Sequence, residues 1–192
     1  MSALLELDGR ILLLIQDNLR SELWTWFWRG VTFLGNGGWF WIALGIALLF
    51  FKKTRFAGLT ALLSLLLCFL ITNLLLKNLV ARPRPYEEIS ALIPLIAKPT
   101  DYSFPSGHAC ASFASAFMYI RTLPRRYGVM TIVLASMIAF SRLYLGVHYP
   151  SDILGGIAVA AFGSWLVSHF AGKICRKRET IEEIDGGKQN NE

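Results

Sequence analysis

Charged residues are scarce in this chain. Asp, Glu, Lys and Arg make up only 17% of its 192 residues, whereas 54% are hydrophobic. A soluble domain carries about 25% charged residues, so the composition argues against a soluble protein. The hydrophobic residues also fall in long runs, and such runs predict membrane spans. The length corresponds to a single domain.

Cysteine is also scarce, and no two of the three cysteines form a CxxC pair. Cys68 and Cys110 lie inside apolar runs, and Cys175 is the third. An odd and dispersed set indicates neither a disulfide framework nor a zinc site, so we interpret these thiols as small hydrophobic side chains. The sequence also lacks a carboxylate cluster of the kind that holds magnesium. We therefore expect no metal and no other cofactor.

The N-terminus lacks the basic stretch of a signal peptide, because Glu6 and Asp8 precede its apolar residues. Over the whole chain, 19 basic residues exceed 13 acidic ones, which gives a net charge of +6. A basic balance can indicate nucleic-acid binding, but here the basic residues sit at the ends of apolar runs. That placement is typical of membrane topology, so we expect no nucleic-acid partner.

Five apolar runs have the length and composition of helices that cross a membrane, or come close to it. Their ranges are 37–51, 56–76, 106–120, 128–147 and 151–171. A span needs roughly 17–25 residues, so the first run must borrow residues from its N-terminal flank. The sequence thus predicts an all-α, polytopic transmembrane helical bundle of about five spans. Six spans are the alternative.

Residues 1–36 carry too many charges for one ordinary span. Residues 6–29 contain seven charged side chains, and each Asp, Lys or Arg at a membrane centre costs about 2.5–3.5 kcal/mol. We expect amphipathic, interfacial helices over 1–36, a transmembrane domain over 37–172 and a cytoplasmic polar tail over 173–192. The end of that tail, 179–192, is predicted to be disordered. One helical face of the N-terminal segment is apolar and consists of Leu4, Leu7, Ile11, Leu14 and Ile15.

Three basic clusters assign an orientation to the bundle. They join runs one and two, join runs three and four, and follow run five, so they fall on one side if the spans alternate. The positive-inside rule makes that side cytoplasmic and places the segments 78–105 and 146–150 outside. The clusters consist of Lys52, Lys53 and Arg55; of Arg121, Arg125 and Arg126; and of Lys173, Arg176, Lys177 and Arg178.

The outer face gathers three cations where apolar runs end or begin. Lys77 ends the second run, Arg84 follows it, and Arg142 ends the fourth run. Cations at one depth repel each other unless an anion lies among them. Ser106 and Gly107 begin the third run, and the free amides of a helix N-terminus bind anions. A tetrahedral oxyanion such as phosphate fits all of these groups.

Two of the three histidines flank the same face. His148 precedes Asp152 by four residues, and Asp152 falls in the first turn of the fifth run. A carboxylate on one imidazole nitrogen fixes the tautomer and leaves the other nitrogen free to attack. His108, in the first turn of the third run, could donate a proton to a leaving oxygen. We interpret several other polar residues as helix-end, topology or loop residues, namely Arg82, Glu87, Glu88, Lys98, Asp101 and His169.

Together these residues resemble the signature of the type 2 phosphatidic acid phosphatase family, the membrane branch of the vanadium haloperoxidase superfamily. That family shows Lys, six residues and Arg-Pro; then Pro-Ser-Gly-His; then Ser-Arg, five residues, His, three residues and Asp. Every fixed position matches in order, and the three blocks together are specific. Here they are Lys77 to Arg84-Pro85, then Pro105-Ser106-Gly107-His108, then Ser141-Arg142 to His148 and Asp152.

The resemblance implies a role for each matched residue. His148 would attack phosphorus and form a phosphohistidine, Asp152 would hold His148, and His108 would protonate the leaving lipid oxygen. Water would then release phosphate, with cations in place of a metal. The groups implied to hold the phosphate oxygens are Lys77, Arg84, Ser106, Gly107 and Arg142.

The resemblance also implies a substrate class. We expect a lipid phosphate or diphosphate, with undecaprenyl diphosphate ranked before phosphatidic acid and phosphatidylglycerol phosphate. The enzyme would be an integral protein of a bacterial cell membrane with its site at the extracytoplasmic face. A lipid phosphotransferase and a vanadate-dependent haloperoxidase-like enzyme are the alternatives.

Overall fold

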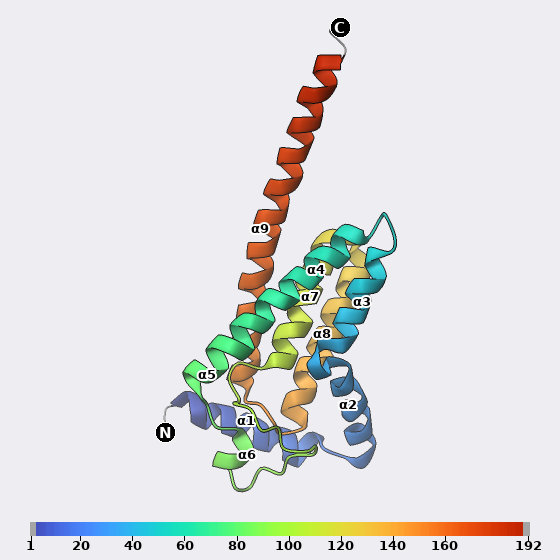
Figure 1. Ribbon diagram of the computed structural model, residues 1–192. Coiled ribbons are helices and arrows are strands. Elements are labelled where there is room, and N and C mark those ends of the chain that lie inside the picture. Colours follow the sequence, from blue (N-terminus) through green and yellow to red (C-terminus); the bar gives the residue numbers. More distant parts are fainter. Residues whose placement is uncertain (1–2, 190–192) are drawn as a thin grey trace.

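The computed structural model describes residues 3–189, and it describes side-chain surroundings for residues 3–172 (Figure 1). Over residues 3–189 every regular element is helical, which confirms the predicted all-α class. The elements are α1 (Ala3–Leu19), α2 (Glu22–Gly35), the 3₁₀ turn η1 (Asn36–Gly38), α3 (Trp39–Leu49), α4 (Arg55–Phe69), the π-helical segment η2 (Leu70–Leu76), α5 (Lys77–Val80), α6 (Pro85–Glu88), α7 (Gly107–Thr122), α8 (Arg125–Tyr144) and α9 (Pro150–Gln189).

Four helical stretches are long and apolar enough to cross a membrane, namely Glu22–Leu49, Arg55–Glu88, Arg125–Tyr144 and Pro150–Gly172. The remaining expected span, 106–120, corresponds to α7, which has 16 residues. α7 packs against α4, α8 and α9. Its small side chains Ala109, Ala114 and Ala116 are completely buried, because small residues let neighbouring helices approach closely. The bundle is therefore built around α7.

The first stretch combines α2 and α3. Ser21 caps α2 by accepting a hydrogen bond from the Trp24 amide. Gly37 and Gly38 join the two helices with φ values of 57° and 69°, a left-handed conformation that glycine adopts without strain. The predicted run 37–51 does borrow apolar residues from its N-terminal flank, through this kink.

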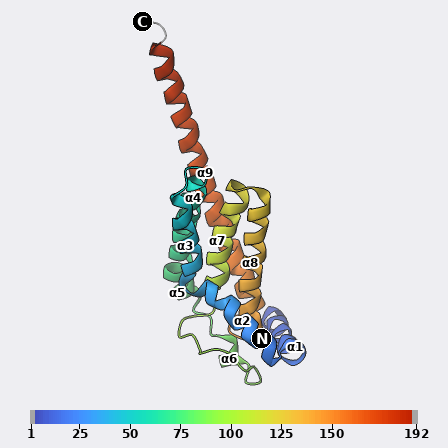
Figure 2. The same ribbon diagram turned by 90° about the vertical axis from the view of Figure 1, so that its right-hand side faces the viewer.

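α1 lies across one end of the bundle, beside α6 and the loop that follows it (Figures 1 and 2). The predicted apolar face is largely its outward face, since Leu4, Leu7 and Leu14 are all more than half exposed. The face that packs on the bundle carries Asp8 and Leu12, both almost completely buried. A buried carboxylate on an interfacial helix must find partners inside the protein, and the sequence pattern did not indicate this.

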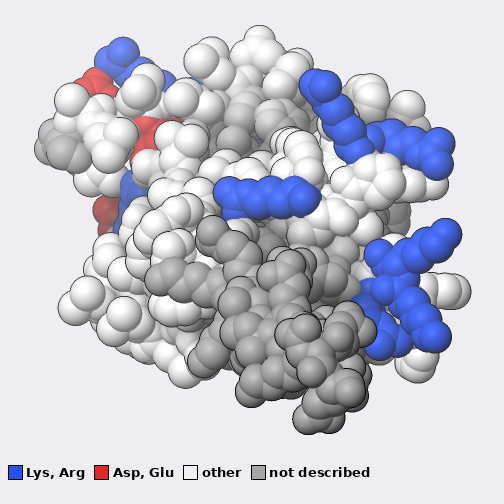
Figure 3. All heavy atoms as spheres, turned by 90° about the horizontal axis from the view of Figure 1, so that it is seen from above, with Lys and Arg blue, Asp and Glu red and all other residues white. Residues whose placement is uncertain are grey.

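α9 projects from the opposite end of the bundle and continues to Gln189 (Figure 1). The prediction of disorder over 179–192 is therefore wrong for residues 179–189, which belong to α9; residues 190–192 lie outside the described part. Basic side chains cover more of the described surface than acidic ones when the molecule is viewed from this end (Figure 3). The α3–α4 and α7–α8 connections lie here, with Lys52, Lys53, Arg121 and Arg125 in or beside them.

Candidate active site

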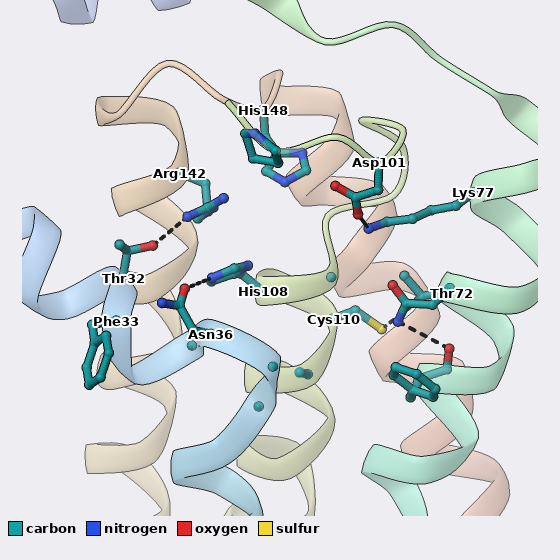
Figure 4. Close-up of a pocket in the computed structure, with 18 of the residues that line it drawn as sticks. Thr32, Phe33, Asn36, Thr72, Lys77, Asp101, His108, Cys110, Arg142 and His148 are labelled. Atoms are coloured by element: carbon teal, nitrogen blue, oxygen red, sulfur yellow. Dashed lines mark hydrogen bonds and ion pairs between the residues drawn. The ribbon is translucent and has the colours of Figure 1, made fainter. Parts of the chain in front are cut away.

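A pocket of about 700 Å³ lies at the end of the bundle that α1 crosses (Figure 4). Six of the eight predicted site residues line it, namely Lys77, Arg84, Gly107, His108, Arg142 and His148. The other two, Ser106 and Asp152, are completely buried behind it. The structure thus brings together residues from α5, α7, α8, α9 and the segments that precede α6, α7 and α9, as their spacing predicted.

The three predicted cations are withdrawn from solvent. The exposed fractions of Lys77, Arg84 and Arg142 are 7%, 2% and 3%. Arg142 donates to the Thr32 hydroxyl over 2.7 Å, while its buried Nε has no hydrogen-bond partner. Because burying an uncompensated cation is costly, this arrangement favours an anion in the pocket.

Asp101 supplies an internal anion. Its Oδ2 accepts from the Lys77 ammonium group, and its Oδ1 accepts from Arg84 over 2.6 Å. Burial raises the pKa of Asp101, but the hydrogen bond and charge of Lys77, together with Arg84, outweigh it and hold the pKa at about 2. The interpretation of Asp101 as an ordinary loop residue is wrong. Two neighbouring cations need a counterion, and this need could have pointed to a carboxylate in the adjoining loop. No spacing in the sequence identifies which carboxylate provides that charge.

Ser106 and Gly107 form the beginning of α7. The Ser106 hydroxyl accepts from the Ala109 amide over 3.4 Å and so caps the helix. A Cβ at Gly107 would come within 3.9 Å of the Lys77 ammonium group, so a side chain there would take up space beside that cation. The amides at this helix start therefore lie next to the pocket, whereas the Ser106 hydroxyl is used for capping.

His148 lies between Asp152 and Arg84. Its Nδ1 is 3.4 Å from Asp152 Oδ2, a long contact, and its Nε2 is 3.4 Å from a guanidinium nitrogen of Arg84. Burial, together with the charges of Arg142 and Arg84, lowers the pKa of His148 to about 4, although Asp152 acts in the opposite direction. The imidazole is therefore neutral near pH 7, as a nucleophile must be.

His108 lies in the first turn of α7, facing the same pocket from below His148 in the view of Figure 4. Its Nε2 donates to the side-chain oxygen of Asn36 over 2.9 Å. Gly35 passes so close that a Cβ there would lie 2.7 Å from the His108 ring. The N-terminal segment thus contributes Thr32 and Asn36 to the site, and the sequence motifs indicated neither.

Asp152 is held on both of its oxygens. Oδ2 accepts from the Ser103 hydroxyl over 2.5 Å and from the Tyr149 amide over 2.9 Å. Oδ1 accepts from Arg82 over 2.7 Å. The interpretation of Arg82 as a topology signal is therefore wrong, because its guanidinium group points into the protein. The sequence pattern correctly placed Lys77 and Arg84 at the pocket and Arg82 outside it, but it did not indicate that Arg82 binds Asp152 from behind.

Comparisons with known proteins identify the family of the chain. Residues 57–175 match the PAP2 superfamily model. An undecaprenyl-diphosphatase of Sulfolobus acidocaldarius is 35% identical over 66% of this chain and 59% of its own length. The phosphatidylglycerophosphatase B of Bacillus subtilis is 32% identical over 91% of this chain and 86% of its own. The crystal structure of the PAP2-type phosphatidylglycerolphosphate phosphatase from the same organism superposes with a TM-score of 0.74 at 28% identity, covering 91% of this chain and 89% of that one.

The fold and the pocket define an integral membrane protein of the helical lipid-phosphatase class. Within that class the chain belongs to the PAP2 superfamily, the family that its sequence motifs resemble.

Proposed function

We propose that the protein hydrolyses a lipid phosphate or diphosphate through a phosphohistidine on His148. The observation that carries this proposal is the position of His148: a neutral imidazole with a carboxylate behind Nδ1 and a buried arginine beside Nε2. The carboxylate behind Nδ1 places an orienting group next to the nucleophile, and the arginine beside Nε2 places a cation where the phosphate charge would lie.

In the first half of the reaction, the phosphate group takes the place of the Asp101 carboxylate against Lys77 and Arg84. His148 Nε2 attacks phosphorus while the bond to the lipid oxygen breaks, and protonated His108 gives that oxygen the proton on its Nδ1, since its Nε2 hydrogen is bonded to Asn36. Asp152 stabilises the positive charge that develops on the His148 ring. Arg84, Arg142 and the amides that begin α7 stabilise the negative charge on the equatorial oxygens.

The second half regenerates the enzyme. Neutral His108 takes a proton from water, the resulting oxygen attacks phosphorus, and the nitrogen–phosphorus bond breaks. Inorganic phosphate leaves, and His148 is neutral again. Every proton and electron pair is accounted for by the two histidines and water, so the chain's own side chains suffice for the reaction.

The pocket also has the character needed for an amphiphilic ester. Its polar end holds the cations, and its wall continues along apolar residues such as Phe33, Leu65 and Phe69. The similar enzymes carry names for diphosphate and monophosphate lipid substrates. Among undecaprenyl diphosphate, phosphatidic acid and phosphatidylglycerol phosphate, we rank undecaprenyl diphosphate first. The basic end opposite the pocket supports a bacterial cell membrane location with the pocket at the extracytoplasmic face.

The test is phosphate release by purified protein from a panel of these lipids, in the presence of EDTA. Hydrolysis by the unaltered protein and its loss in His148→Ala are expected. A requirement for added Mg²⁺, or undiminished activity in His148→Ala, would contradict the mechanism. Transfer of phosphate to a second lipid would identify a phosphotransferase, and halide oxidation with vanadate would identify a haloperoxidase-like enzyme. For a phosphatase, vanadate should only inhibit.

A further inference from the structure

Arg82 lies behind the His148–Asp152 pair and does not line the pocket. One guanidinium nitrogen donates to Asp152 Oδ1 over 2.7 Å, and another donates to Asp8 Oδ2 over 2.9 Å. The guanidinium group also stacks on the Tyr149 ring at 3.9 Å. The exposed fractions of Asp8 and Asp152 are 2% and 0%. A planar guanidinium group is therefore held between two buried carboxylates.

Asp8 also holds the start of α9. Its Oδ1 accepts from the Ser151 amide over 3.1 Å, and its Oδ2 accepts from the Ser151 hydroxyl. Arg82 donates to that same hydroxyl over 2.7 Å. Asp152 is the residue after Ser151. The Asp8 carboxylate therefore anchors both Arg82, which binds Asp152, and the helical turn to which Asp152 belongs.

The chain of contacts runs from Asp8 through Arg82 and Asp152 to His148. A buried ion pair is sensitive to the loss of either partner, because the remaining charge stays uncompensated. Arginine suits this place since its rigid fork can serve two acceptors, which a lysine cannot do with the same geometry. Asp8 also lies outside residues 57–175, the part that matches the family model.

We propose that Asp8 and Arg82 are positioning residues for phosphoryl transfer, which makes helix α1 part of the catalytic unit. Neither residue touches the phosphate. Together they set the orientation and charge of Asp152, which in turn holds the His148 ring and stabilises its cationic form. This inference rests on the proposed function, because it requires His148 to be the nucleophile.

If Asp8 and Arg82 set the charge around Asp152, replacing either one should shift the pH dependence of kcat/KM. A purely structural role would leave that pH dependence unchanged. The charged and titratable groups facing His148 are Asp152, Arg84, Arg142 and His108, and those facing Asp152 are His148 and Arg82. Removing the positive charge in Arg82→Gln raises the proton affinity of His148, so the acid limb of kcat/KM moves to higher pH. Removing the negative charge in Asp8→Asn has the opposite sign and moves it to lower pH.

The experiment compares Asp8→Asn, Arg82→Gln, Arg82→Lys and the unaltered full chain in kcat, KM and pH profile. Glu6→Gln is the matched control, since Glu6 lies on the same helix but pairs with Arg10 at the surface. We expect kcat to fall about tenfold in Asp8→Asn, as for other partners that orient a catalytic group, with KM unchanged. Arg82→Lys should lose kcat while its acid limb stays in place. Glu6→Gln should match the unaltered protein.

Two results would overturn the proposal. One is an Asp8→Asn variant with unaltered kcat and pH profile. The other is a loss of activity in both charge variants with unmoved acid limbs, which would leave only a structural tether. Vanadate binding, measured as protection against thermal unfolding, reports whether each variant keeps its pocket. If the unaltered protein hydrolyses nothing, or His148→Ala stays active, the proposed function fails instead.

Discussion

The carboxylate of Asp101 lies 2.6 Å from the guanidinium group of Arg84 and contacts the Lys77 ammonium group at the same time. In the proposed mechanism, an anion of the protein therefore occupies the position where a phosphate oxygen would bind. Any incoming anion has to displace it, and this competition sets how tightly the free site holds phosphate.

Replacing Asp101 with Asn should strengthen inhibition by orthovanadate and by inorganic phosphate. The neutral amide leaves two buried cations without their internal counterion, so an external anion gains their full attraction. We expect the inhibition constants to fall by about tenfold, which corresponds to ~1.4 kcal/mol. Glu88→Gln removes an exposed carboxylate from α6 and should leave them unchanged. Weaker inhibition in Asp101→Asn would show that Asp101 assists anion binding.

The pH dependence of hydrolysis should reflect a neutral His148. Burial lowers the pKa of His148 to about 4, and only the deprotonated ring can attack. Activity should thus be retained well below pH 6.5 and should fall as the pH drops through about 4. Returning the sample to pH 7 and regaining activity separates this titration from unfolding. An acid limb centred near 6.5 would mean that the ring is not withdrawn from water.

Removal of the His148 ring should abolish the covalent intermediate. In His148→Ala we expect hydrolysis to fall by about 10⁴-fold or more, as when other nucleophiles are removed. Brief reaction with a ³²P-labelled lipid phosphate should label the unaltered protein in an alkali-stable, acid-labile form. Label retained by His148→Ala would point to another nucleophile.

His108 and Asn36 should affect leaving-group protonation. Asn36 accepts the Nε2 hydrogen of His108 and so holds the ring. The proton for the leaving oxygen therefore comes from Nδ1, and a poor leaving group needs that proton most. His108→Gln should slow hydrolysis of an alkyl phosphate far more than that of p-nitrophenyl phosphate, whose leaving group is already acidic. Asn36→Leu should show the same selectivity at smaller magnitude. Equal losses on both substrates would argue against an acid at this position.

Thr32 should affect kcat through its hydrogen bond with Arg142. The Thr32 hydroxyl accepts a hydrogen bond from Arg142 Nη1 over 2.7 Å, so the nearly isosteric Thr32→Val frees the guanidinium group to move. Losing one preorganised charge stabiliser outright costs about 10²–10³-fold in kcat. Arg142→Gln should reach that range, and Thr32→Val should fall short of it. Turnover measurements on the two variants check this order.

Sequence reasoning identified the pocket residues because their spacing is short and fixed. His148 lies two residues before α9, and Asp152 lies in the first turn of that helix. Lys77 begins the short helix α5, and Arg84 follows seven residues later, just before α6. Such local spacing constrains position whatever the rest of the fold does. The all-helical bundle followed equally directly from the length of the apolar runs.

The remainder of the site comes from far along the chain. Asp8, Thr32 and Asn36 reach the site only because α1 and α2 pack on the bundle end, and their own neighbours in sequence carry no motif. In α1 the apolar pattern indicated the outward face, because apolar residues on an interfacial helix can face lipid as well as protein. Tertiary packing, and not periodicity, decided which carboxylate was buried.

The contact between Asp8 and Ser151 joins residues that are 143 positions apart. During synthesis the first helix must wait for the last one to be inserted before either can complete the environment of Asp152. A nascent or truncated chain that ends before α9 therefore lacks an assembled catalytic pair. Activity therefore requires both the first and the last helix of the bundle to be in place.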